Sequence, residues 1–229
     1  MQGARFEILS PAHLAALAVV AAAAVGLTWT VRRWPAADRP IRIALAAFLV
    51  AATGLFLAVL LPPGWTLWDV LPLHLCDFLI FVAVLALLTL RPLACELLYF
   101  CACSGTALAM VTPDLEHAWP APQFAIYFAL HGGVVVSALV VTAGSGRAPR
   151  PGAAWRAWGL LNLYALAVGA IDLAAGMNFL FLCAPPPVPT LLDWMGPWPV
   201  YLIVADAIAL GVFLALALPF RAHSAERPG

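Results

Sequence analysis

The sequence contains few charged residues and no lysine. Only 10% of its 229 residues are charged, and 65% are hydrophobic. A soluble globular domain carries about 25% charged residues. This composition excludes an ordinary soluble domain, because a chain with so little polar surface would precipitate from water.

The sequence also lacks a nucleotide-binding loop, an internal repeat and any hydrophilic domain. It therefore predicts no nucleic-acid partner and no cofactor. Five cysteines are present, but four lie inside apolar runs, which excludes the disulfide framework of a small secreted protein. Cys101 and Cys103 form a C-x-C pair, but on a helix they diverge by about 200° and do not share a metal ion.

What the sequence has instead is seven long apolar runs. Their approximate bounds are 11–31, 41–61, 70–90, 92–111, 122–143, 155–181 and 198–220. Each run is roughly 20 residues long and can cross a hydrocarbon core of about 30 Å as a helix. Because lipid cannot hydrogen-bond the backbone, helices are expected. We predict an all-α protein with a single seven-helix transmembrane domain over residues 1–220 and a disordered tail over 221–229.

The arginines indicate how these helices are oriented. All but Arg5 fall in alternate loops or in the C-terminal tail, at positions 32, 33, 39, 42, 91, 147, 150, 156, 221 and 227. Cytoplasmic loops carry an excess of basic residues. We therefore predict a multi-pass protein of the cytoplasmic (plasma) membrane, with the N-terminus outside and the C-terminus in the cytoplasm.

Polar side chains interrupt the apolar runs at a few positions. Apart from Glu96, which is expected near the cytoplasmic face, they are His13, His74, Cys76, Asp77, His131, Asp172, Asn178 and Asp206. An ionisable group in the bilayer costs at least about 2.5 kcal/mol on insertion scales, so each is a hypothesis of function. The predicted topology places all of them in the outer half of the membrane. We expect them to form a polar cavity open to the outer leaflet.

The densest polar segment is LPLHLCDF at residues 71–78. Pro72 suits the first turn of a helix, and the helix dipole there favours a cysteine thiolate, so Cys76 is the candidate nucleophile. His74 lies on another helical face from Cys76 and is a poor direct base, although Asp77 is spaced to orient it.

A base from another helix is better placed. His131 has the matching predicted depth, and the adjacent Gly132 and Gly133 allow close approach of a neighbouring helix or a substrate chain. A cysteine and a histidine, with an acid or amide to orient them, are the usual equipment for acyl transfer through a thioester.

Other interpretations of these residues stay open. Intramembrane cysteines and histidines often serve helix packing alone. His74, Cys76, Asp77 and His131 are suitable zinc ligands by type, but they lack a strong ligand spacing such as H-x-x-x-H, and we predict no metal. Asp172 and Asp206 fit proton carriers of a transporter, although no inverted repeat accompanies them.

Six motifs resemble a known family. They are FEILSPAH at 6–13, LPLHLC at 71–76, TPDL at 112–115, the segment around His131, GMNFLFL at 176–182 and GPWPVY at 196–201. In this order they resemble the YwaF-like bacterial integral membrane family, which is similar to the eukaryotic transmembrane protein 164 acyltransferases. The resemblance implies a seven-helix protein of a bacterial inner membrane.

The resemblance also implies a chemistry. The eukaryotic relatives resemble lipid acyltransferases that move a fatty acyl chain between phospholipids through a cysteine acyl-enzyme assisted by a histidine. The matching positions are Cys76 and His131. The chain departs from the pattern at Phe179, where a tyrosine is expected, and at Asp172, where an amide is common.

We therefore expect an enzyme of the outer leaflet that acts on a phospholipid or lysophospholipid within the bilayer. His74, Asp77, Asn178, His13, Asp172 and Asp206 are expected to support or orient the catalytic pair. The alternatives are a lipid hydrolase at the same site, or a carrier or sensor for a small lipid or ion that uses Asp172 and Asp206. The sequence leaves the oligomeric state open.

Overall fold

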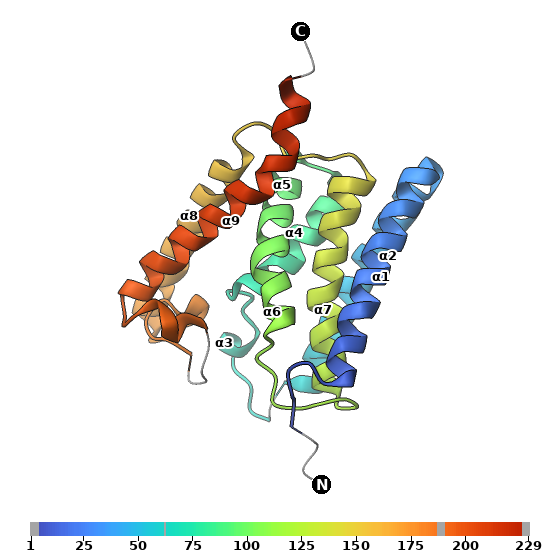
Figure 1. Ribbon diagram of the computed structural model, residues 1–229. Helices are drawn as coiled ribbons and strands as arrows, with labels where there is room; N and C mark the ends of the chain where they lie inside the picture. Colours follow the sequence, from blue (N-terminus) through green and yellow to red (C-terminus); the bar gives the residue numbers. More distant parts are fainter. Residues whose placement is uncertain (1–4, 62, 187–190, 226–229) are drawn as a thin grey trace. The chain divides into compact units, whose positions relative to one another are not determined.

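The structure is a computed structural model that describes residues 5–61, 63–186 and 191–225. The chain is 77% helical, and within the described ranges its β-structure amounts to one isolated bridge between Arg5 and His117. Among the described residues, six helices are long and apolar enough to cross a membrane, and a shorter apolar helix covers Leu75–Thr89 (Figure 1). The chain is thus an all-α, multi-pass membrane protein. Its orientation in the membrane stays a prediction.

The chain divides into two compact units. The first comprises the described residues of Met1–Leu71 and Phe78–Pro149, and the second those of Pro72–Asp77 and Arg150–Gly229. Helix α4, Leu75–Thr89, begins in the second unit and continues in the first. A single transmembrane domain stays a prediction.

The first unit holds most of the helices. They are α1 (Pro11–Arg33), α2 (Asp38–Leu60), the short α3 (Leu67–Val70), most of α4, α5 (Pro92–Cys101), α6 (Ala107–Val111) and α7 (Pro122–Leu139). A π-helical turn over Ala102–Thr106 joins α5 to α6, and another over Val140–Gly144 extends α7. Prolines open α1, α5 and α7, where a missing N–H and a fixed φ suit the first turn.

Helix α7 is the centre of this unit, and both α1 and α2 pack against it. Two adjacent glycines permit the approach. A Cβ at Gly132 would lie 2.5 Å from Cγ2 of Val20 on α1, and one at Gly133 would lie 2.8 Å from Cδ2 of Leu49 on α2. The sequence left open whether these glycines admit a helix or a substrate chain. Here each admits a helix.

A polar network fastens the end of α2 nearest Asp38. Nε of Arg42 donates to Oδ2 of Asp38 at 3.0 Å, and its guanidinium also donates to the carbonyl of Leu87 near the end of α4. The hydroxyl of Ser145 donates to the other carboxylate oxygen of Asp38. Arg42 is only 8% exposed. Its guanidinium therefore satisfies a carbonyl in the last turns of α4, in addition to being one of the arginines that predict the orientation in the membrane.

The second unit is built on α8 (Ala153–Ala175) and α9 (Val200–Ala225). Short 3₁₀ turns over Phe179–Phe181 and Leu191–Met195 lie in the connection between them. α8 ends at Gly176, whose φ is 68° and whose N–H donates to the carbonyl of Asp172. A left-handed residue at this place is a common helix terminator, and glycine adopts it without strain.

Three predicted boundaries differ from the structure. The third span begins at Leu75 rather than 70, because residues 71–74 include Pro72 and are not helical. The sixth ends at Ala175 rather than 181 because Gly176 terminates it, so Asn178 lies in a loop. The seventh continues to Ala225, five residues into the predicted tail. The rest of that tail, 226–229, lies outside the described residues.

The close approach at α7 predicts opposite effects for two glycine-to-alanine changes. Gly132→Ala should lower the free energy of unfolding by about 1–3 kcal/mol, because the new methyl group collides with the β-branched side chain of Val20. Gly54→Ala on α2 meets nothing within 4 Å and should be neutral or stabilising by up to about 1 kcal/mol. Thermal unfolding in detergent measures both, and equal melting temperatures would contradict the packing role of Gly132.

Candidate functional site

The candidate nucleophile lies in the first turn of α4. Cys76 is the second residue of this helix, and His74 immediately precedes it. The chain that leads into α4 is held from α8. The hydroxyl of Tyr164 donates to the carbonyl of Leu73 at 2.9 Å and to that of Pro72 at 3.4 Å. This contact fixes the direction from which the backbone reaches Cys76.

His74 lies among aromatic rings of the loop that follows α8. Its ring centroid is 5.3 Å from that of Phe179 and 5.8 Å from that of Phe181. Leu180 and Phe181 both have φ of 56°, a left-handed conformation that costs roughly 1–2 kcal/mol for a residue with a side chain. Such strain persists only where surrounding contacts impose it, and it concentrates at functional sites.

Contacts from α8, from α9 and from the segment just before α9 impose this conformation on the loop. Oδ1 of Asp172 accepts the N–H of Phe179 at 3.0 Å, and the Asp172 side chain is 1% exposed. The hydroxyl of Tyr201 donates to the carbonyl of Phe181. The indole of Trp198 donates to the carbonyl of Leu182 at 2.9 Å.

Asn178 closes the same loop on itself. Its Oδ1 accepts the N–H groups of Cys183 at 2.9 Å and Ala184 at 3.2 Å, while its Nδ2 donates to the carbonyl of Ala184 at 3.0 Å. A side-chain amide that replaces backbone partners in this way is typical of a tight turn. Asn178 therefore shapes the loop that carries the two phenylalanines against His74.

Asp206 joins the two long helices of the second unit. Its Oδ1 accepts hydrogen bonds from the indole of Trp158 at 2.8 Å and from Nδ2 of Asn162 at 2.9 Å. Both donors are neutral groups of α8. Polar contacts between helices are a usual means of association in membranes, so Asp206 has a structural partner in each donor.

In the first unit, His13 binds backbone groups through both ring nitrogens. Nδ1 accepts the N–H of Leu9 at 3.0 Å, and Nε2 lies 2.9 Å from the carbonyl oxygen of Met110. Since a carbonyl only accepts, Nε2 carries the proton and the ring is neutral. The ring is fully buried and contacts those of Phe6 and Phe128. His13 thus anchors the chain before α1 to the end of α6.

His131 also binds a backbone carbonyl, but through one nitrogen. Its Nδ1 lies 3.0 Å from the carbonyl oxygen of Tyr127, and its ring stacks on the Tyr127 ring with centroids 3.9 Å apart. The hydroxyl of Tyr127 in turn donates to the carbonyl of Ala109 at 2.8 Å. Because Nδ1 must donate to a carbonyl, the neutral ring has its lone pair on Nε2. That is the tautomer required of a base acting through Nε2.

The predicted site residues therefore fall in two groups. The second unit contains His74, Cys76, Asp77, Asp172, Asn178 and Asp206, and the first contains His13 and His131. The Cys76–His131 pair and the polar cavity would draw on both units and stay predictions, as does the orientation of His74 by Asp77. Among the residues that the structure describes, no cluster of three histidine, cysteine or acidic side chains is arranged to hold a metal ion.

The motifs that resemble a known family are also divided between the two compact units. Three of them meet in the second unit, around residues 71–76, 176–182 and 196–201, and the N-terminal motif meets the end of α6 in the first. A model of the TMEM164 family matches residues 8–217. The chain belongs to the TMEM164 family. Comparison with curated proteins and with solved structures gives no match, and the likeness to YwaF-like bacterial proteins stays a prediction.

Several residues that build this site were not predicted from the sequence pattern of this TMEM164-family chain. Tyr164, Trp158 and Asn162 all lie on α8 and bind either the segment before α4 or Asp206. Asn162 is an amide inside an apolar run, which is itself a signal of an interhelical contact. Tyr164 and Trp158 gave no such signal, because aromatic residues are common in spans for packing alone.

The loop contact of Asp172 gives a prediction for hydrogen exchange. Asp172→Ala removes the acceptor of the Phe179 N–H, and loss of a buried hydrogen bond costs roughly 1–3 kcal/mol. The Phe179 amide should then exchange about tenfold faster or more. Asp172→Asn keeps an acceptor oxygen and should exchange nearly as the wild type does. Exchange mass spectrometry on protein in detergent measures both, and unchanged protection in the alanine variant would exclude this role.

Proposed function

We propose that this protein is a membrane-embedded acyltransferase that moves a fatty acyl chain between phospholipids through an acyl-enzyme on Cys76. Membership of the TMEM164 family supports a membrane protein of this kind. The observation that carries the proposal is the position of Cys76 in the first turn of α4, two residues after His74, whose ring contacts the strained loop that follows α8. The positive end of the helix dipole at such a first turn stabilises negative charge.

In the first half-reaction, Sγ of Cys76 attacks the carbonyl carbon of a phospholipid ester. The oxyanion that forms is stabilised by the positive end of the α4 helix dipole. The ester C–O bond then breaks, and the lysophospholipid alkoxide leaves with the proton that the thiol gave up. The products are a thioester on Cys76 and a lysophospholipid.

In the second half-reaction, the hydroxyl of a lysophospholipid attacks the thioester. Its proton passes to a base, the C–S bond breaks, and the thiol recovers the proton. We assign the base to His131, because its Nδ1–H is held by the carbonyl of Tyr127 and its lone pair is on Nε2. Water in place of the lysophospholipid would make the enzyme a lipid hydrolase with the same residues.

A carrier or sensor that depends on Asp172 and Asp206 is the alternative. The contacts of these carboxylates favour the enzyme. Asp172 binds the backbone of Phe179, and Asp206 accepts two hydrogen bonds from α8, so each has a structural task within the second unit. Ion pathways use intramembrane carboxylates that can release their partners.

The acyl-enzyme predicts an adduct at one cysteine. Wild-type protein incubated with mixed phospholipids and a lysophospholipid should exchange acyl chains and carry an acyl group on Cys76. Cys76→Ala should lose the adduct and exchange by at least about 10⁴-fold, as expected when a covalent nucleophile is removed. Mass spectrometry of lipids and protein measures both.

Cys183→Ala is the matched control, because this cysteine is exposed in the loop that follows α8. It should retain both exchange and adduct. Full exchange by Cys76→Ala would exclude the mechanism. Release of free fatty acid without a new phospholipid would identify the hydrolase.

The carrier hypothesis predicts the opposite result, in which Asp206 is required for activity and Cys76 is not. Asp206→Asn keeps an oxygen that can accept from Trp158 and Asn162, so the enzyme hypothesis expects acyl exchange to stay within about threefold of wild type. A carrier would instead lose ion or lipid flux in this variant while Cys76→Ala stayed active. Flux through proteoliposomes, measured beside acyl exchange for both variants, distinguishes the two.

A further inference from the structure

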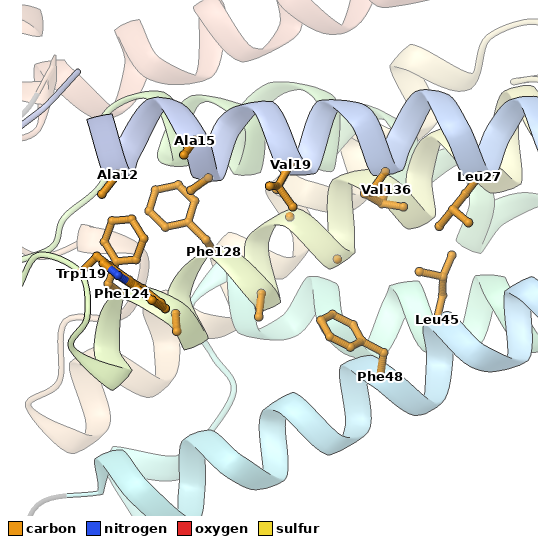
Figure 2. A pocket seen from close by; sticks show the side chains of 17 residues that line it. Ala12, Ala15, Val19, Leu27, Leu45, Phe48, Trp119, Phe124, Phe128 and Val136 are labelled. Atoms are coloured by element: carbon orange, nitrogen blue, oxygen red, sulfur yellow. The ribbon is translucent and has the colours of Figure 1, made fainter. Parts of the chain in front are cut away.

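The first unit contains a groove that the proposed chemistry does not use. Its volume is about 650 Å³. Helix α7 lies between α1 and α2 and contributes the floor, and side chains of α1 and α2 flank it (Figure 2). Trp119, Phe124 and Phe128 gather at one end, and Leu27 and Leu45 stand at the other. The groove therefore runs lengthwise along the helices.

Side-chain size creates this space. Along the groove α1 presents Ala12, Ala16 and Ala23, and α7 presents Ala125 and Ala129. Larger residues at these positions would fill the gap between helices that already touch at their closest point. An unfilled apolar space loses the dispersion contacts of every atom that lines it, so in a membrane the groove favours an occupant.

The dimensions of the groove select a single chain. Ala12 and Leu27 on α1 are fifteen residues apart, which at 1.5 Å per residue is about 22 Å. A volume of about 650 Å³ distributed over this length makes the groove long and narrow. A polymethylene chain fits, since carbon atoms pack at about 3.5–4.0 Å.

The lining residues also indicate which kind of lipid provides the chain. Every lining residue is apolar apart from the indole nitrogen of Trp119. A free fatty acid would bring a carboxylate to a site with no cation among its lining residues. A phospholipid chain leaves its polar end outside. Val19 and Phe48 are 68% and 46% exposed, so the groove is open along its length, and a chain can enter sideways from the bilayer.

We propose that this groove binds one acyl chain of a bilayer phospholipid. The site is independent of the acyl-transfer proposal, since it requires binding and no reaction. Trp119, at one end of the groove and 59% exposed, is of a type that prefers the level of the lipid head groups. The chain lies with its ester end near Trp119 and its methyl end toward Leu27.

The test uses the full chain in phosphatidylcholine vesicles. A small fraction of the phosphatidylcholine carries a diazirine in a sixteen-carbon acyl chain, and peptides labelled on irradiation are mapped by mass spectrometry. We expect adducts on the groove residues of α1 and α7. Ala16→Phe should reduce them by about tenfold, because the phenyl ring occupies the volume of the chain. Ala21→Phe should leave them unchanged.

Ala21 is the matched control because it is exposed on α1 and five residues along from Ala16, about 140° around the helix. Adducts of equal frequency at Leu14 and Val25, which do not line the groove, would overturn the proposal. The wild-type map decides this even if Ala16→Phe does not fold.

Three further outcomes bear on the occupant. Labelling by a diazirine fatty acid but not by the diazirine phospholipid would show that the occupant is a free fatty acid. Crosslinks between the α1 segments of two chains, formed by a bifunctional photoreactive reagent, would identify a second copy instead. Both results would contradict the proposal. Unchanged groove labelling in Cys76→Ala supports it and separates it from the proposed acyl transfer.

Discussion

A backbone inside a lipid bilayer must find its hydrogen-bond partners within the protein, and this requirement organises the whole chain. The long helices meet it by themselves. Among the described residues, three segments where a helix stops show how side chains meet it instead: the residues before α1, the residues before α4 and the loop after α8. At each of them a polar side chain provides what the helix cannot. His13 serves the first, Tyr164 the second and Asp172 the third.

This requirement explains most of the polar residues in the spans. A histidine, an aspartate or an asparagine at membrane depth suggests chemistry, yet Asn178 and His13 here bind backbone groups, and Asp206 binds two side chains of α8. The residues proposed for catalysis differ from these in kind. His131 binds the backbone through only one ring nitrogen of the two, and Cys76 stands where a helix begins. The polar groups that have structural partners are thus distinct from the two groups that we propose to react.

The sequence could predict the helices because strong signals bound them. Pro11, Pro92 and Pro122 each open a helix at the predicted residue or next to it, and the apolar runs between such breakers are long. The end of α8 could not be placed, because the apolar run continues past Gly176 although the backbone turns there. Hydropathy indicates which environment a residue prefers but contains no information about the backbone angle φ. The π-helical turn over Ala102–Thr106 could not be predicted for the same reason. For the candidate site, the sequence indicated only the types of residue that could react. The contact made by Tyr164 could not be predicted, because aromatic residues in membrane helices often serve packing alone.

Helix α4 is only 15 residues long, which corresponds to about 22 Å at 1.5 Å per residue. A hydrocarbon core of about 30 Å exceeds this length by roughly 8 Å. Membranes respond to such a hydrophobic mismatch by thinning around the short element. Thinning beside α4 would draw the ester groups of nearby lipids inward, toward the helical turn that carries Cys76. The length of one helix would then set the depth at which a thiol and a lipid ester meet.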